Sequence, residues 1–181
     1  MALKNRELSE TFNIEFQKWK RWSREFLPSE KIRALGKGYA REYSHNEAFI
    51  VYLGGHLVSA LDFSIPDAKK IIEDLTPFFD SKGLFPKAKN FRPTKRDKLV
   101  KGWKINIYPN DQLGFDYIAR GHIDEKTIKY KGEGVHQEIF VEERISILKP
   151  GELEKTNLSK GKLLDISFLL TSFQLKLEGE I

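Results

Sequence analysis

The sequence predicts an α+β fold in which a helical N-terminal half precedes a β-rich C-terminal half. Up to about Lys82, apolar residues recur every three or four positions, which is the period of an amphipathic helix. From Trp103 onward the period shortens to two, as in strands that bury one face. Between them lies a stretch rich in lysine and arginine that contains two prolines. We therefore expect a helical domain at 1–83, a basic linker at 84–102 and a β-rich domain at 103–181.

Two helices are expected before Pro28. Leu3, Leu8 and Phe12 indicate a short amphipathic helix within residues 3–12, and Asn13 suits the turn that follows it. The next helix has a largely aromatic face that should pack in the core, and the proline ends this helix. The residues of that face are Ile14, Phe16, Trp19, Trp22 and Phe26.

The remaining surface of this second helix is mostly basic. An α-helix fits the major groove of DNA, where lysine, arginine and glutamine hydrogen-bond base edges or phosphates. Because the apolar face takes the opposite side, we expect Gln17, Lys18 and Arg21 to face the groove. The candidate DNA-binding residues of this helix are Gln17, Lys18, Lys20, Arg21 and Arg24.

Residues 29–43 predict a basic hairpin. Gly36 and Gly38 allow a tight turn, and Tyr39 and Tyr43 are expected to hold the base of the hairpin against the core. A basic hairpin beside a basic helix is typical of a winged helix-turn-helix, in which the hairpin, or wing, lies along phosphates. The candidate DNA-binding residues of the hairpin are Arg33, Lys37, Tyr39 and Arg41.

Two further helices are expected, and each begins at a recognisable start signal. Ser44 and Glu47 have the spacing of a capping box, and Ser64 and Asp67 have the same spacing. Pro66 is tolerated in the first turn of the second of these helices. The expected helices span residues 47–61 and 64–79.

Glycines have two expected roles in this pair of helices. Gly54 and Gly55 inside the first helix cost about 1–2 kcal/mol of stability relative to alanines. Because glycine has no side chain, the pair is useful if another helix must approach closely. Gly83 suits the left-handed position that follows the second helix.

Over residues 6–75 these signals, in this order, resemble the DNA-binding domain of the MerR family of transcriptional regulators. They correspond to the end of that family's recognition helix, to its wing and to the start of its fourth helix. The resemblance implies a winged helix-turn-helix that binds double-stranded DNA, with the recognition helix in the major groove and the wing on the backbone. The stretches that carry it are Glu25-Phe26-Leu27-Pro28, Gly38-Tyr39-Ala40-Arg41-Glu42-Tyr43-Ser44 and Asp62-Phe63-Ser64-Ile65-Pro66-Asp67-Ala68.

The sequence departs from that family where a long dimerising coiled coil should follow. Pro86 and Pro93 interrupt this region, and the wing has one residue more than the family's usual pattern. Paired half-sites on DNA normally require a dimer. The β-rich domain is therefore the candidate for homodimerisation, and the sequence leaves open whether it senses a ligand or binds another protein.

The β-rich half is expected to contain five strands separated by turn residues such as Gly121 and Lys149-Pro150-Gly151. The last of them also fits helical spacing through Leu163, Ile166, Leu169, Leu170 and Phe173, and a strand is the preferred interpretation. The expected strands are Trp103–Tyr108, Phe115–Arg120, Thr127–Tyr130, Glu138–Leu148 and Leu164–Leu177.

Composition limits the class of protein. Residues 1–104 contain 21 Lys/Arg and 13 Asp/Glu, whereas residues 105–181 contain 10 and 13, so positive charge is concentrated in the first half. This distribution suits a nucleic-acid module joined to a partner domain. The absence of cysteine excludes disulfides and thiolate metal sites. Without an apolar run of about 20 residues or a signal peptide, a cytoplasmic protein that does not enter the membrane is expected.

A metal-dependent nuclease is the enzymatic alternative. No acid is followed by Glu-x-Lys in a convincing strand context, and the four histidines are scattered without ligand spacing. We therefore predict no catalytic residue, metal or cofactor. The acids available for such a site are Asp116, Asp124, Glu125, Glu138, Glu142 and Glu143.

A third possibility is an adaptor, in which the winged helix binds a protein instead of DNA. Convergence of Lys18, Arg21, Lys37 and Arg41 on one face would favour DNA, and dispersal would favour the adaptor. The preferred prediction is a DNA-binding transcriptional regulator that is not an enzyme.

Overall fold

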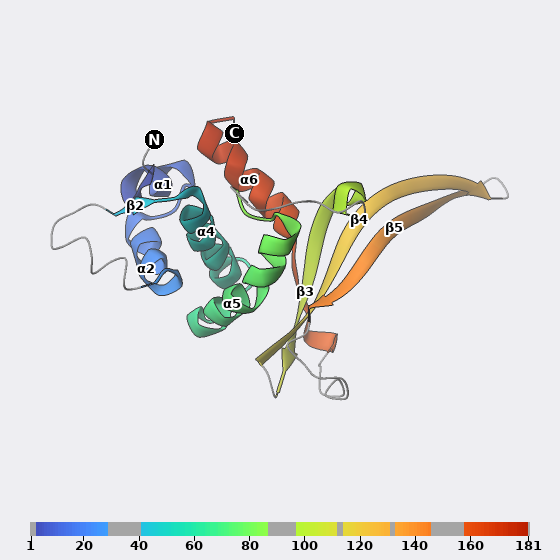
Figure 1. Ribbon diagram of the computed structural model, residues 1–181, viewed down its shortest axis with the longest axis horizontal. Helices are drawn as coiled ribbons and strands as arrows, with labels where there is room; N and C mark the ends of the chain where they lie inside the picture. Colours follow the sequence, from blue (N-terminus) through green and yellow to red (C-terminus); the bar gives the residue numbers. More distant parts are fainter. Residues whose placement is uncertain are drawn as a thin grey trace. The chain divides into compact units, whose positions relative to one another are not determined.

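The structure is a computed structural model that describes residues 3–28, 41–86, 97–111, 114–130, 133–145 and 158–180. Within these ranges the chain forms five α-helices and two antiparallel sheets, which confirms the mixed α+β class (Figure 1). The chain divides into two compact units. The first comprises Met1–Asn90 together with Leu169–Ile181, and the second comprises Phe91–Phe168.

The first unit begins with a small sheet and two helices. Strand β1 (Leu3–Lys4) leads directly into helix α1 (Asn5–Thr11), and helix α2 (Phe16–Phe26) follows. Strand β2 (Glu42–Tyr43) pairs antiparallel with β1. The expected helix within 3–12 is therefore confirmed except at its start, where the chain is extended.

Helices α4 (His45–Ser59) and α5 (Ile65–Lys82) begin directly after the two predicted serine caps, but α4 ends before residue 61 and α5 continues beyond residue 79. The Ser44 hydroxyl accepts the Glu47 backbone N–H at 3.2 Å, and the Glu47 carboxylate accepts the Ser44 backbone N–H at 2.9 Å. Ser64 caps α5 by accepting the Asp67 backbone N–H at 3.2 Å. Gly83 follows α5 with a φ of 68°, the left-handed conformation that glycine adopts most readily.

The core of the first unit is rich in aromatic residues from helices far apart in the sequence. Phe173, on helix α6 (Ile166–Glu178), stacks on Phe12 with ring centroids 5.0 Å apart and meets the Phe49 ring edge-on at 5.2 Å. A Cβ added at Gly54 would overlap the Phe26 ring, and one added at Gly55 would overlap the Trp22 ring. The paired glycines thus let the aromatic face of α2 pack directly on α4, as the sequence predicted.

The second unit is built on a four-stranded antiparallel sheet in the order β5-β4-β3-β6. In β3 every second residue from Trp103 to Ile107 is buried, and Ile105 and Ile107 are fully buried. All of β3 pairs with β4 from Gly102↔His122 to Asn110↔Gly114. The strands are β3 (Gly102–Asn110), β4 (Gly114–Tyr130), β5 (Glu133–Ile145) and β6 (Lys162–Leu164).

The hairpin of β4 and β5 is longer than the rest of the sheet. Residues Asp124–Tyr130 of β4 pair with Glu133–Ile139 of β5, whereas the pairing of β4 with β3 ends at His122. A shift of register between His122 and Asp124 marks the point where this two-stranded extension begins. Figure 1 shows the extension as a long curved ribbon of the second unit.

Two of the strand predictions are wrong. Gly121 does not separate two strands, because β4 runs through it; a Cβ there would lie 3.0 Å from the Trp103 ring and 2.9 Å from Val141. Leu164–Leu177 is not a strand, because only Leu164 belongs to β6 and the chain from Ile166 is helical. The predicted C-terminal domain at 103–181 also differs from the observed units, since Leu169–Ile181 groups with the first unit.

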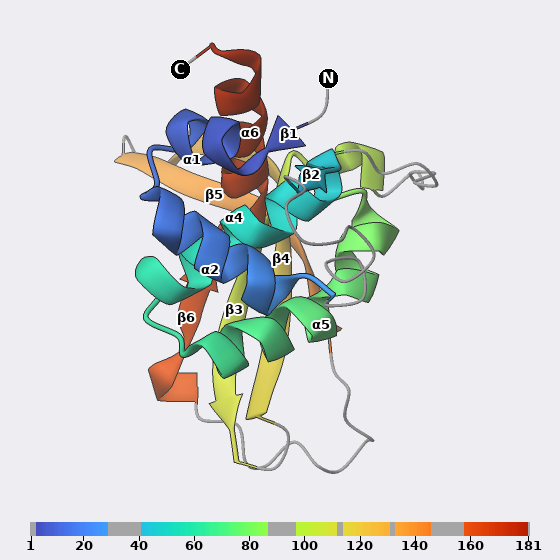
Figure 2. The ribbon, with the colours of Figure 1, turned by 90° about the vertical axis from the view of Figure 1, so that its left-hand side faces the viewer.

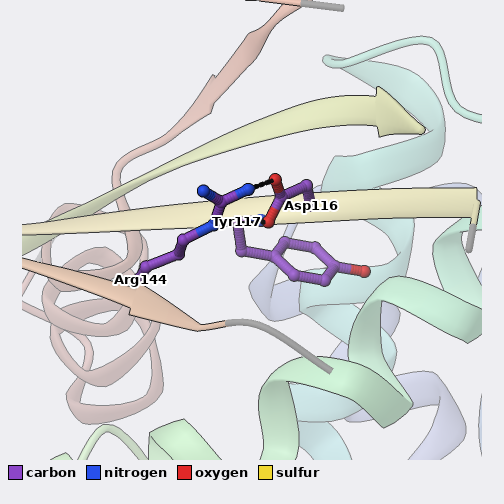
Figure 3. A network of polar contacts seen from close by, with 3 residues as sticks. All are labelled: Asp116, Tyr117 and Arg144. Atoms are coloured by element: carbon purple, nitrogen blue, oxygen red, sulfur yellow. Dashed lines mark hydrogen bonds and ion pairs between the residues drawn. The ribbon is translucent and has the colours of Figure 1, made fainter. Parts of the chain in front are cut away.

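An ion pair between a buried aspartate and a partly exposed arginine links β4 to β5 (Figure 3). The Asp116 side chain is 2% exposed, and its carboxylate accepts a hydrogen bond from Arg144 Nε at 3.3 Å and a second from the Arg144 Nη2 group. The backbone N–H of Tyr117 also donates to Asp116 Oδ1 at 3.0 Å. The carboxylate is thus buried and held by several donors.

Among the described residues, no helix is both long enough and apolar enough to span a membrane.

Candidate nucleic-acid interface

Helix α2 presents a row of polar side chains to solvent. Gln17, Lys20, Arg21 and Arg24 are all exposed, and their spacings of three, four and seven residues place them on one helical face. Trp19, Trp22 and Phe26 are buried on the other side. In Figure 2 this helix lies in front of α4. We call Gln17, Lys20, Arg21 and Arg24 the α2 row.

Lys18 is exposed but lies to one side of the α2 row. Its ammonium Nζ is 5.4 Å from the centroid of the Trp22 ring, four residues along the helix. Such a cation–π contact contributes about 0.5–1 kcal/mol at an exposed position. The sequence grouped Lys18 with Gln17 and Arg21, whereas the structure places it where the basic surface meets the buried indole.

The cations of the α2 row differ in their partners from two other cations of the first unit, Arg6 and Lys70. On α1, Arg6 Nε lies 3.8 Å from Glu10 Oε1, and on α5, Lys70 Nζ lies 3.2 Å from Asp74 Oδ2. Within the described part of the chain, no acidic side chain pairs with Lys20, Arg21 or Arg24. The positive charge of the α2 row is therefore available to an external anion.

Two hollows lie at the ends of α2. One of about 370 Å³ lies beside the α1–α2 turn and is lined by Arg6, Asn13 and Phe16 among others. The other, of about 550 Å³, lies where α2 ends and is lined by residues that include Arg24 and Lys69. Each hollow is lined by carboxylates as well as cations, with Glu10 and Glu15 in the first and Glu25 and Glu73 in the second.

The predicted wing is described only at its C-terminal end. Arg33, Lys37 and Tyr39 lie outside the described residues. Arg41 is partly buried, and its guanidinium carbon lies 5.3 Å from the centroid of the Tyr43 ring. Both terminal nitrogens of Arg41 are buried and have no hydrogen-bond partner among the described groups.

Tyr43 is buried and links β2 to helices α1 and α2. Its hydroxyl donates a hydrogen bond to Asn5 Oδ1, and its ring meets the Trp19 ring edge-on with centroids 6.3 Å apart. Burial raises the pKa of Tyr43 above its ordinary value of 10.0, while the Ser23 hydroxyl and the charge of Arg41 oppose that rise. Asn5 was not among the residues predicted from the sequence, because a contact between positions 5 and 43 leaves no local pattern.

Three of the six acids available for a nuclease site have cationic partners among the described residues. Asp116 binds Arg144, Glu142 Oε2 accepts from Arg120 Nε at 2.8 Å, and Asp124 Oδ1 lies 3.3 Å from Lys101 Nζ. In the ranges that the structure describes, no group of three or more His, Asp or Glu side chains is arranged to hold a metal ion. Here these carboxylates link neighbouring strands and the segment beside them.

Comparisons with protein-family models, with curated proteins and with solved structures gave no match for this chain.

Proposed function

We propose that the protein is a DNA-binding transcriptional regulator that places α2 in the major groove and the 29–43 segment along the backbone. The observation that carries the proposal is the α2 row, an exposed face of one glutamine and three cations that pair with no acid among the described residues. These side chains can hydrogen-bond guanine, adenine or phosphate. Their helix is seated on α4 by a buried aromatic face, so the row is held on a rigid element.

The proposal also gives the second unit the task of pairing two copies of the chain. Two features support it: among the described strands the β4–β5 extension pairs only with itself, and Ile139 and Phe140 at its base are 36% and 44% exposed. An isolated two-stranded hairpin is marginally stable in water, so a partner surface would stabilise it. Two paired copies would present two α2 helices to successive half-sites.

The test is the affinity of the full chain for a random-sequence duplex pool, measured by fluorescence anisotropy over a salt series. Arg21→Ala with Arg24→Ala should weaken binding about tenfold or more and reduce the slope of log affinity against log salt by about 0.9 per lost phosphate contact. Binding stoichiometry from the same titrations should be two chains per preferred duplex.

The matched control is Arg6→Ala with Lys70→Ala, which removes the same charge from α1 and α5 of the same unit. These cations are already paired with acids, so their loss should change affinity much less. If both double variants weakened DNA binding equally, net charge alone would explain the loss of affinity. That result would contradict a specific role for α2. If the folded chain does not bind duplex DNA, the protein-binding adaptor becomes the better proposal.

A further inference from the structure

The hollow at the end of α2 brings helix α5 beside the α2 row (Figure 2). Arg24, the last residue of that row, and Lys69 of α5 both line this hollow of about 550 Å³. Both side chains are exposed. The surface around Arg24 therefore includes a second cation, which comes from a different helix.

The floor of the hollow is apolar and joins α2 to α5. Phe26 at the end of α2, Leu27 just after it and Ile72 of α5 line the hollow and are buried. Ile50 of α4 lines it as well. Burial of an apolar side chain of this size contributes about 1.5–3 kcal/mol, so this floor resists separation of the two helices. Lys69 therefore keeps its place beside the end of the α2 row.

Lys69 differs from its neighbour Lys70 in its ionic partner. Lys70 Nζ lies 3.2 Å from Asp74 Oδ2, one turn along α5. Lys69 forms no ion pair with any acid in the ranges that the structure describes. The ammonium group of Lys69 can therefore bind an anion from outside, whereas that of Lys70 is already neutralised.

Two acids in the same hollow decide which kind of anion fits it. Glu25 and Glu73 are exposed and line the hollow together with Arg24 and Lys69, so the four charges cancel. A single small anion gains little from a site whose net charge is zero. A DNA strand differs, because its successive phosphates contact the cations of the α2 row as well as Lys69. The charge pattern therefore favours a polyanion over one phosphate.

A helix in the major groove also brings its neighbours to the sugar–phosphate backbone that borders the groove. Lysine suits such a contact, because its ammonium is a compact charge on a flexible stem. We infer that Lys69 binds a phosphate beside the groove that α2 occupies, so that α5 is part of the DNA interface. This inference rests on the proposed function, because it requires α2 to bind DNA.

The first experiment compares Lys69→Ala with Lys70→Ala, which removes the same charge from the adjacent position. The affinity of each full-length variant for a random-sequence duplex pool is measured by fluorescence anisotropy over a salt series, and the melting temperature verifies the fold. Lys69→Ala should lower the salt slope by about 0.9 and weaken binding about eightfold at 0.1 M salt. Lys70→Ala should change both much less, and Lys69→Arg should retain binding because it keeps the charge.

The second experiment tests the contact in the unaltered chain. Lysines are acetylated with acetic anhydride, and the modified positions are identified by mass spectrometry. The duplex pool should protect Lys69 from acetylation and leave Lys70 as reactive as it is in the free chain. Inorganic phosphate at the same ionic strength should protect neither lysine.

Three results would overturn the inference. The first is an equal effect of Lys69→Ala and Lys70→Ala on DNA binding, and the second is equal acetylation of Lys69 with and without the duplex. The third is protection of Lys69 by inorganic phosphate alone, because the hollow would then be a site for a single anion.

The same measurements separate this contact from the proposed function. If Arg21→Ala with Arg24→Ala weakens binding and Lys69→Ala does not, only the contact from α5 is rejected. If the unaltered chain does not bind duplex DNA, the proposed function fails and this contact fails with it.

Discussion

Helix α2 and the four-stranded sheet both carry exposed cations, but the two regions differ in what those cations contact. On the sheet each described arginine side chain bonds a carboxylate on a neighbouring strand: Arg120 with Glu142 and Arg144 with Asp116. On α2 no described acid pairs with Lys20, Arg21 or Arg24. The comparison teaches that charge alone does not identify a binding surface. Cations that are neutralised by carboxylates on neighbouring strands stabilise the fold. Cations without such a partner can bind an anion from outside.

The largest expected effect is on the sheet side of this comparison. Arg144→Ala would leave the buried Asp116 carboxylate without its cation, and breaking a buried pair by removing one partner typically costs about 3–5 kcal/mol. Because the Arg144 side chain is 37% exposed, we expect about 3 kcal/mol. Urea denaturation of the full chain measures this loss.

Two further variants complete that test. Arg120→Ala removes an exposed partner of Glu142 and should cost less than about 1 kcal/mol. Arg21→Ala with Arg24→Ala should change stability by about 0.5 kcal/mol or less, as is usual for unpartnered surface residues. If the α2 double variant were as unstable as Arg144→Ala, the distinction between structural and available cations would be lost.

The features that the sequence predicted well are local ones. The two serine caps, the left-handed Gly83 and the buried aromatic residues of α2 from Trp19 to Phe26 each depend on residues within about one turn of helix, so a short window contains the whole pattern. Phe16 was predicted on the same buried face but is 39% exposed. The α2 row follows from the same period, because the positions opposite Trp19 and Phe26 must face solvent. Only Lys18 is displaced, and its contact with Trp22 also lies one turn away.

The features that could not be predicted depend on contacts between distant residues. The pairing of Leu3 with Tyr43 joins two-residue strands, which are too short to show alternation. Gly121 resembles a strand break, but it lies in β4 because the Trp103 ring occupies the space above it. In α6, Ile166, Leu169 and Phe173 fit a helix and a buried strand about equally, and packing of Phe173 against Phe12 and Phe49 favours the helix.

An effect of intermediate size is expected on the buried side of α2. It distinguishes the packing of this helix on α4, which stabilises the fold, from the exposed α2 row. Gly55→Ala gains about 1 kcal/mol in helix propensity but places a methyl group inside the Trp22 ring. Overpacking of this kind costs about 1–3 kcal/mol, so a net loss of stability is expected. Thermal unfolding would measure it, with Ser59→Ala on the same helix as the control for local propensity. A melting temperature at or above that of the unaltered chain would mean that α2 can shift freely on α4.

The smallest expected effect on stability comes from His56, which is half-buried on α4. It shows how burial acts on a charged side chain that has no compensating partner among the described residues. Burial lowers the pKa of His56 below its ordinary value of 6.5, because the charged imidazolium loses solvation. The unfolded chain therefore binds a proton at His56 more readily than the folded chain does. Stability contributed by the neutral side chain is fully present above pH 6.5, and it declines as the pH falls from there through the lower pKa of the folded state.

His56→Gln isolates this contribution, because every other titrating group is common to both proteins. The free energy of unfolding of the unaltered chain should fall more between pH 7.5 and about 5 than that of the variant, and the two curves should run parallel above the ordinary histidine pKa. Chemical denaturation at a series of pH values measures the difference. Parallel curves over the whole range would mean that the His56 imidazole stays solvated in the folded chain. A steeper fall for the variant would mean that the folded chain stabilises the charged imidazolium. That result would imply a carboxylate that pairs with His56, as carboxylates pair with the arginines of the sheet.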